Sequence, residues 1–300
     1  MYLFNEQLNK EQDWERIFQV PLVFAPLVEH ILKKENLPLA EIENLTPGIN
    51  AVFKVGEYVI KIFAPEESGV EQRLPQTEIF AAQKADLSGV LVPKIVASGV
   101  VEDKYRFAYL ITEYVDAVEI AELVDVEKIA VGRKLRELTN KMNVPCELGK
   151  GIDIMNDKAR DSLWDKYSEE VKKERLAYVK SHQYGENVLV HTDLCGDNIL
   201  LTPKGELYII DFADVILAPK IYEHAALALD SGIDPLILRG YFHDYTVEKF
   251  TEMCFNGLLI IDYDPEMVEP IIGKPDEFQT LDDLRKRINQ RMKGVINGEG

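Results

Sequence analysis

Cysteine is scarce in this sequence of 300 residues. The three cysteines, Cys146, Cys195 and Cys254, are an odd number, lie far apart and form no C-x-x-C pair. This spacing excludes both a disulfide framework and a zinc site built on cysteine ligands. We interpret them as reduced thiols of a cytoplasmic protein.

Long apolar runs and a basic leader are also missing. The most apolar early stretch, residues 18–28, is interrupted by Pro21 and Pro26 and is too short to cross a bilayer. The first residues lack the positively charged segment of a secretory signal. We therefore expect no secretion, no membrane partner and a cytoplasmic location.

Positive charge is in deficit. The chain has 34 basic and 52 acidic residues, which gives a net charge of −18. A field of this sign repels nucleic acids and anionic membranes and attracts cations, so we expect no nucleic-acid partner. A hydrophobic content of 46% over this length is enough for a sizeable core and excludes general disorder.

The first third of the chain has the pattern of a small antiparallel sheet. After a mainly helical segment at 1–40, residues 51–55 and 58–63 alternate as strands around Gly56-Glu57, the pattern of a hairpin. Residues 76–87 have helical spacing, and residues 93–100 and 106–113 again resemble strands. The sequence thus predicts a sheet with one helix inserted after its opening strands.

The remainder is mainly helical. Long helices are predicted over 126–142 and 158–182, and short strands over 187–190, 198–201 and 207–210. After Asp214 we expect helices to the end of the chain. The predicted boundary between the two parts lies near residues 114–119.

One stretch combines carboxylate and amide side chains in a pattern that indicates a metal site. It runs His191-Thr192-Asp193-Leu194-Cys195-Gly196-Asp197-Asn198 and is followed by Ile210-Asp211-Phe212-Ala213-Asp214. Asp193 and Asn198 lie five residues apart on a loop, and Asp211 ends the next strand. Oxygen ligands of this kind suit a hard cation such as Mg²⁺.

On these residues the sequence resembles the aminoglycoside phosphotransferase and choline kinase branch of the protein-kinase-like superfamily. That branch has H-G-D-x-x-x-x-N followed by I-D-F/W-G/E, and here Thr192 and Ala213 replace the usual glycines. The resemblance covers about residues 44–230. It implies an α+β, two-lobed protein-kinase-like fold with an N-terminal antiparallel sheet and a mostly helical C-terminal lobe. The expected lobes are 1–115, nucleotide-binding with a helical extension at 1–40, and 116–300, catalytic and acceptor-binding.

The resemblance also implies roles for single residues. Asp193 would orient the acceptor hydroxyl and accept its proton, while Asn198 and Asp211 would hold Mg²⁺ on the phosphates of ATP or GTP. His191 would brace the loop. The sequence does not choose between the two nucleotides.

Upstream, Lys61 occupies the place of the strand lysine that contacts the phosphates. Glu78, seventeen residues later, is its expected acidic partner, with Glu71 as the alternative. Two further segments complete the expected nucleotide site: the linker with Glu113 and Val115, and the phosphate-covering loop at 46–50 with Asn50. That loop has one glycine, so the G-x-G-x-x-G pattern of protein kinases is absent.

Each of these residues alone has a simpler explanation. Lys61 could be an edge-strand lysine, Glu78 a surface acid and Asp211 a turn residue. Their joint occurrence, in order and on the expected elements, favours the kinase-like interpretation. Asp197 and Asp214 either face the acceptor or cap a turn. Cys195 has no activating base beside it in the sequence, so we interpret it as an ordinary thiol.

Acidic residues concentrate in the region expected to bind the acceptor. Residues 221–280 contain twelve acids and three bases, a net charge of −9. This favours a small cationic acceptor such as an aminoglycoside, with Asp197, Asp230, Asp234 and Glu266 as candidate contacts. The alternative is a solvated acidic surface that aids solubility.

Two further alternatives stay open. A choline- or ethanolamine-type acceptor would require an aromatic cage, for which the candidates are Tyr222, Tyr241, Phe242, Tyr245 and Tyr263. A kinase-like protein could also bind nucleotide without turnover. We expect a monomer or a weak dimer.

Overall fold

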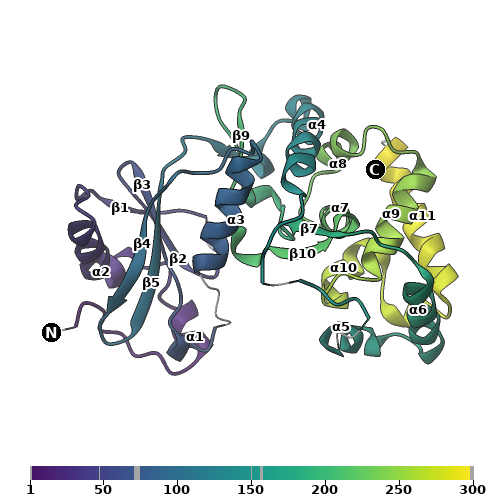
Figure 1. The fold of residues 1–300 in the computed structure, drawn as a ribbon, viewed down its shortest axis with the longest axis horizontal. Coiled ribbons are helices and arrows are strands. Elements are labelled where there is room, and N and C mark those ends of the chain that lie inside the picture. The colour runs from purple at the N-terminus through teal and green to yellow at the C-terminus, as the bar shows by residue number, and fades with distance from the viewer. Residues whose placement is uncertain (1, 47, 71–74, 150, 156–157, 298–300) are drawn as a thin grey trace. The chain divides into compact units, whose positions relative to one another are not determined.

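The computed structural model describes residues 2–46, 48–70, 75–149, 151–155 and 158–297. The chain forms two compact units, each treated separately below (Figure 1). The N-terminal unit comprises Met1–Ala82 and Val92–Asp116, and the C-terminal unit comprises Gln83–Leu91 and Ala117–Gly300. The expected fold class, an antiparallel N-terminal sheet with a mostly helical C-terminal part, is confirmed.

The N-terminal unit is built on five antiparallel strands in the order β1-β2-β3-β5-β4. Their bounds are β1 Ile42–Asn44, β2 Ala51–Val55, β3 Tyr58–Ile62, β4 Ile95–Glu102 and β5 Arg106–Glu113. The turn between β2 and β3 uses Gly56 at φ 62°, a left-handed conformation that glycine adopts without strain. The four strands predicted after residue 50 are therefore confirmed.

One face of this sheet is covered by the N-terminal segment, which contains α1 (Glu11–Glu15) and α2 (Pro21–Lys34). Phe24 and Ile31 of α2 pack in one buried cluster with Phe53, Ile60 and Phe107 of the strands. Side chains alternate across a strand, so Lys61 points away from the face that carries Ile60. On that side lies α3 (Pro75–Leu87), which begins in the N-terminal unit and ends in the C-terminal unit.

The C-terminal unit contains helices α4 to α11. Their bounds are α4 Asp125–Met142, α5 Lys158–Leu163, α6 Glu169–Ser181, α7 Lys220–Ala228, α8 Pro235–Tyr241, α9 Val247–Leu258, α10 Pro265–Ile272 and α11 Leu281–Asn297. Among the described residues, no helix combines the length and the apolar content that a bilayer crossing requires.

The prediction of one helix over 158–182 is wrong. The chain leaves the helical conformation at Tyr167 and Ser168, and the Ser168 hydroxyl accepts a hydrogen bond from the Val171 amide to begin α6. Serine is a favourable N-cap because its oxygen binds an amide that lacks a helical partner. The helical spacing of apolar residues continues across this break, which is why the pattern concealed it.

The helical prediction directly after Asp214 is also wrong. Residues Ile216–Pro219 form β10, which pairs antiparallel with β7 (Asn187–Val190). A second small sheet joins β6 (Val118–Glu119), β8 (Ile199–Leu201) and β9 (Leu207–Ile209) in the order β6-β8-β9. β6 and β10 each pair with a strand distant in sequence, so no local pattern marks them.

Helices α4 and α8 cross at closely approaching backbones. A Cβ at Gly132 would collide with the carbonyl oxygen of Ile237, and one at Gly240 with that of Ile129. Only glycine permits so close an approach, because any side chain at these two positions would collide with the other helix. The two helices therefore pack backbone against backbone at this crossing. α4 in turn supports the strands β8 and β9, which lie between the two motif segments 191–198 and 210–214. Lys134 of α4 donates a hydrogen bond to the Gly205 carbonyl in the turn before β9.

Candidate active site

In the N-terminal unit, Lys61 on β3 and Glu78 on α3 form a buried ion pair. The Lys61 Nζ atom lies 3.1 Å from Oε1 and 2.9 Å from Oε2 of Glu78. The two side chains are 10% and 8% exposed. A lysine inside the sheet requires such a partner, because an unpaired buried charge is strongly unfavourable.

The other residues predicted to bind nucleotide have mixed surroundings. The buried Asn50 side chain accepts a hydrogen bond from the Ala64 amide at 3.2 Å, which ties the start of β2 to the end of β3. Glu113 is exposed and pairs with Lys94 at 2.9 Å. Val115 is half-buried. Pro47 of the predicted phosphate loop and Glu71, the alternative partner of Lys61, lie outside the described residues.

In the C-terminal unit, the structure brings Asp193, Asn198 and Asp211 together. The Asn198 Nδ2 atom donates to both the carbonyl and the Oδ2 atom of Asp193, each at 2.9 Å. The Ile210 amide donates to the Asn198 carbonyl at 3.0 Å, so Asp211 directly follows a residue bonded to Asn198. Asp193 itself is exposed. The amide nitrogen of Asn198 thus positions Asp193 and leaves Oδ1 as the atom that could bind a cation.

Glu223 on α7 anchors the loop that carries Asp193. It is fully buried and accepts hydrogen bonds from the amides of His191 (2.6 Å) and Thr192 (3.2 Å) and from Asn143 Nδ2 (3.3 Å). Burial raises the pKa of Glu223 to about 7, against the opposing effect of these donors. The sequence analysis counted Glu223 only as one of many acids. In the sequence, the feature that could have revealed this role is a single acid within the helical segment Tyr222–Ala228. In the structure every side chain of that segment is buried.

Two residues of the motif are in the left-handed conformation without being glycine. Thr192 has φ 69° and Asp211 has φ 58°. Such strain persists only where surrounding contacts hold it, and it is common at active sites. Thr192 is held by its hydroxyl, which donates to the Asp214 carbonyl at 3.0 Å, and by Tyr263, whose hydroxyl donates to the Thr192 carbonyl at 2.6 Å. The resembled pattern has glycine at this position, and glycine would adopt the conformation without strain. Thr192 has a side chain, so it depends on these hydrogen bonds to stay in that conformation.

His191 has surroundings that match the bracing role expected for it. The ring is buried, its Nε2 atom lies 2.9 Å from the Ile210 carbonyl, and it packs edge-on against Phe212 with ring centroids 4.8 Å apart. These contacts join the loop before Asp193 to the strand end before Asp211.

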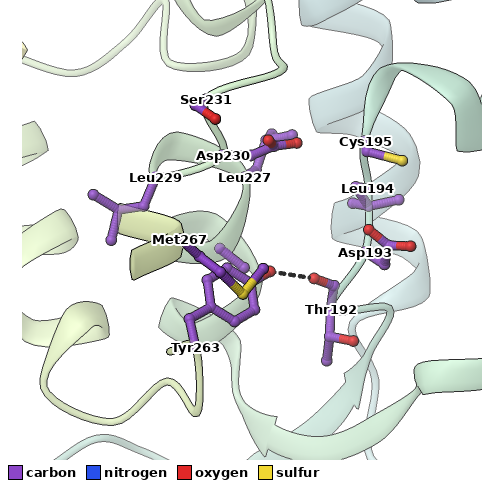
Figure 2. A pocket seen from close by; sticks show the side chains of 11 residues that line it. Thr192, Asp193, Leu194, Cys195, Leu227, Leu229, Asp230, Ser231, Tyr263 and Met267 are labelled. Carbon is purple, nitrogen blue, oxygen red and sulfur yellow. Dashed lines mark hydrogen bonds between the residues drawn. The ribbon is translucent and has the colours of Figure 1, made fainter. Parts of the chain in front are cut away.

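A pocket of about 250 Å³ opens beside Asp193 within the C-terminal unit (Figure 2). Its wall is formed on one side by the loop Thr192-Asp193-Leu194-Cys195 and on the other by Ala226, Leu227, Leu229, Asp230, Ser231, Tyr263 and Met267. Burial, reinforced by the charge of Asp193, raises the pKa of Cys195 to about 11. That thiol is therefore protonated near neutral pH, in keeping with an ordinary rather than a nucleophilic cysteine.

Of the four acids predicted to contact the acceptor, Asp230 lines this pocket. Asp234 instead caps α8 through the Leu236 amide and pairs with Lys128 at 2.6 Å. Glu266 pairs with Lys166 at 2.9 Å on the surface, and Asp197 is exposed in the turn Gly196–Asn198. The acid-rich stretch therefore does not form one continuous site. Several of its acids cap helices or form surface ion pairs.

The aromatic residues proposed for a cage are similarly dispersed. Tyr263 lines the pocket, whereas Tyr222, Tyr241 and Phe242 are completely buried. Tyr245 lies under the guanidinium of Arg136, with 5.3 Å between that group and the ring centroid.

The donor atoms at Asn198 and Asp211 fit Mg²⁺. Among the residues that the structure describes, no group of three or more His, Cys, Asp and Glu side chains is placed to hold a metal ion by itself. Mg²⁺ commonly takes only one or two protein oxygen ligands and completes its shell with phosphate oxygens and water. An amide oxygen and a carboxylate supply that number.

Comparison with known proteins gives the family. The family model described as "Phosphotransferase enzyme family" matches residues 47–255. No curated protein sequence matches the chain.

Two solved forms of a thermostable mutant of aminoglycoside phosphotransferase APH(4)-Ia are similar in fold. The apo form is 14% identical with a TM-score of 0.60 and covers 91% of this chain and 99% of its own. The ternary complex with ADP and hygromycin B is 15% identical with a TM-score of 0.59 and covers 91% and 98%.

A second kind of relative is similar in fold to nearly the same extent. The choline kinase LicA from Streptococcus pneumoniae is 16% identical with a TM-score of 0.53, and the match covers 90% of this chain and 99% of that one. At these identities the likeness concerns the fold and does not distinguish between acceptors.

Proposed function

Because the chain belongs to the phosphotransferase enzyme family, we propose that it is a small-molecule kinase that transfers the γ-phosphoryl group of ATP or GTP to a hydroxyl of a small cationic acceptor. The observation that supports this most strongly is the convergence of Asp193, Asn198 and Asp211 through the bond from Asn198 to Asp193 and the pairing of Ile210 with Asn198. The relative bound to ADP and hygromycin B supports a nucleotide donor and a small-molecule acceptor.

Asp193 has the central role in the reaction. Its carboxylate orients the acceptor hydroxyl and accepts the proton as the hydroxyl oxygen bonds to the γ-phosphorus. The bond from that phosphorus to the β,γ-bridging oxygen breaks, and the nucleoside diphosphate leaves with the electron pair. Asn198 holds Asp193 in one orientation, so less ordering is required on the way to the transition state.

The negative charge of the nucleotide phosphates must be neutralised by other groups of the site. Mg²⁺, held by Asn198 and Asp211, would neutralise charge on the phosphates when bound. In the N-terminal unit, Lys61 would contribute a fixed positive charge to the nucleotide phosphates, and its ion pair with Glu78 keeps it in place. Residues 1–115, with Asn50, Glu113 and Val115, form the nucleotide-binding lobe in this proposal, and residues 116–300 form the catalytic and acceptor-binding lobe.

A choline- or ethanolamine-type acceptor is the second candidate. It is favoured by Tyr263, an aromatic residue that lines the pocket beside Asp193, because aromatic rings attract cations. An amino sugar and a simple amino alcohol both present a hydroxyl and a positive charge, so the same chemistry serves either.

The test is Asp193→Asn, assayed with MgATP or MgGTP and a panel of amino sugars, amino alcohols and choline. We expect the turnover number to fall at least ~10²-fold, the range of general acid–base catalysis, with nucleotide affinity nearly unchanged. Asp211→Ala should instead weaken magnesium-nucleotide binding, measured by calorimetry. Asp276→Asn, an exposed acid outside the motif, is the matched control and should behave as the parent. Full turnover in Asp193→Asn would refute the assignment.

A further inference from the structure

The pocket beside Asp193 is small and largely apolar. Its volume of about 250 Å³ lies below the roughly 300–1,000 Å³ of sites that enclose drug-sized ligands. Met267, which is 56% exposed, is the apolar side chain that lies across from the loop 192–195 (Figure 2), while Leu227 and Leu229 line the pocket as nearly buried residues. A ligand that fills this pocket is compact and presents apolar surface to Met267.

Two carboxylates, those of Asp193 and Asp230, are the charged groups of the pocket lining. Burial is the main cause that raises the pKa of Asp230, and the negative charges of Asp193 and Asp197 raise it further. The Gly232 amide donates to Asp230 Oδ1 at 2.8 Å. In the described part of the chain, no basic side chain forms an ion pair with Asp230. A cation in the pocket would relieve the repulsion between the two carboxylates.

The hydrogen-bonding capacity of the pocket distinguishes kinds of cation. Asp230 has a second carboxylate oxygen that can accept an N–H, and charge-assisted bonds of this kind are strong. A quaternary ammonium has no N–H to donate and depends on several aromatic faces. Tyr263 is the aromatic residue of this lining, and its hydroxyl is already bonded to Thr192. A protonated primary or secondary amine therefore suits the pocket better.

We infer that this pocket binds the acceptor and selects a compact amino alcohol with one protonated amine and an apolar body. This inference rests on the proposed function, since Asp193 must receive the hydroxyl proton. The amine pairs with Asp230, the body packs on Met267 of the pocket lining, and the hydroxyl lies at Asp193. A polycationic amino sugar would leave several ammonium groups against the apolar lining without partners, which is unfavourable.

The experiment compares acceptors that differ in one property. Phosphorylation with MgATP or MgGTP is followed for small primary amino alcohols with increasing apolar bodies, for their uncharged and quaternary analogues, and for a polycationic aminoglycoside. We expect the lowest KM for the primary amino alcohols with an apolar body. A lower KM for the aminoglycoside or for the quaternary analogue would overturn the inference. So would the failure of every amino alcohol to bind, measured by calorimetry in the presence of nucleotide.

Asp230→Asn supplies the second arm, because it keeps the shape and the bond from Gly232 while removing the charge. We expect the KM for amino alcohols to rise at least about tenfold, as one charge-assisted hydrogen bond is lost, with the nucleotide KM unchanged. Asp276→Asn is the matched control, with both values as in the parent.

The two proposals fail differently. An unchanged acceptor KM in Asp230→Asn, with turnover lost in Asp193→Asn, overturns the pocket inference and leaves the phosphotransferase proposal standing. Full turnover in Asp193→Asn overturns the proposed function itself.

Discussion

Lys61 in the N-terminal unit and Asp193 in the C-terminal unit depend on different kinds of support from a buried carboxylate. Glu78 binds the ammonium group of Lys61 directly, whereas Glu223 binds the amides of His191 and Thr192, which precede Asp193. The first arrangement places a charge by partly neutralising it. The second places the main chain and leaves the Asp193 carboxylate exposed, where it can accept a proton. A general base benefits from the second kind of support, and a fixed cation from the first.

Breaking the ion pair should give the largest effect. Lys61→Met leaves the Glu78 carboxylate buried without its counter-charge, so we expect the free energy of unfolding to fall by about 3–5 kcal/mol. Urea unfolding measures this. The matched variant Lys61→Met/Glu78→Leu removes both charges and should recover most of that stability, since paired buried charges are often replaceable by apolar residues.

Nucleotide affinity separates the structural role of Lys61 from its proposed functional role. Both variants lack the ammonium group, so both should bind nucleotide weakly even where stability has been recovered. If the double variant regained stability and full nucleotide affinity together, Lys61 would be a structural residue only.

Removing the charge of Glu223 should have a smaller effect on stability and a different functional effect. Glu223→Gln turns an oxygen acceptor into an N–H donor beside the His191 and Thr192 amides, which should lower the free energy of unfolding by about 1–3 kcal/mol. Because the loop that carries Asp193 shifts, we expect the turnover number to fall with nucleotide affinity unchanged. A parallel loss of nucleotide affinity would contradict the contrast with Lys61.

The pH dependence of stability gives a second readout for the same variant. The pKa of Glu223 is raised from 4.5 to about 7 on folding, so between these values the unfolded carboxyl loses its proton before the folded one. Rising pH then favours unfolding across this window and has no further effect through Glu223 above it. The difference in unfolding free energy, parent minus Glu223→Gln, should decline from pH 5 to pH 7 and then level off. A constant difference would show that Glu223 does not titrate there.

The smallest effect is expected on the surface of the acid-rich stretch. Lys166 contacts Asp264 at 3.1 Å and Glu266 at 2.9 Å, with all three side chains well exposed to solvent. Exposed ion pairs add little, so Lys166→Ala should leave the thermal midpoint and the acceptor KM as in the parent. A raised acceptor KM would return Glu266 to the list of acceptor contacts.

The sequence was most informative where the determinants are local. Alternating strands around Gly56-Glu57 can be recognised within a few residues, and β2 and β3 lie where this pattern indicates. The spacing from Asp193 to Asn198 is equally local, and the two residues are hydrogen-bonded to each other. β10 pairs with a strand that ends 26 residues before it, and its apolar run has no period that marks it as a strand. Such pairings are decided by tertiary contacts.

The function of individual acids depended on tertiary structure in the same way. Glu223, Asp230 and Glu266 look alike as members of a charge count. Folding buries Glu223 against the His191 and Thr192 amides, places Asp230 in a pocket and leaves Glu266 on the surface. Charge density along a chain therefore indicates a region but does not identify which carboxylates meet a ligand.

Helix α7 has a consequence for how acceptor preference can evolve. Glu223 lies in its first half, while Ala226, Leu227 and the residues just beyond its end, Leu229 and Asp230, line the pocket. Asp230 lies seven positions after Glu223, two of them beyond the end of the helix. Repeated rounds of mutation and selection for new acceptors should therefore accumulate changes at positions 226–231. Glu223 should stay fixed in every surviving lineage, so that one short segment has a variable end and an invariant one.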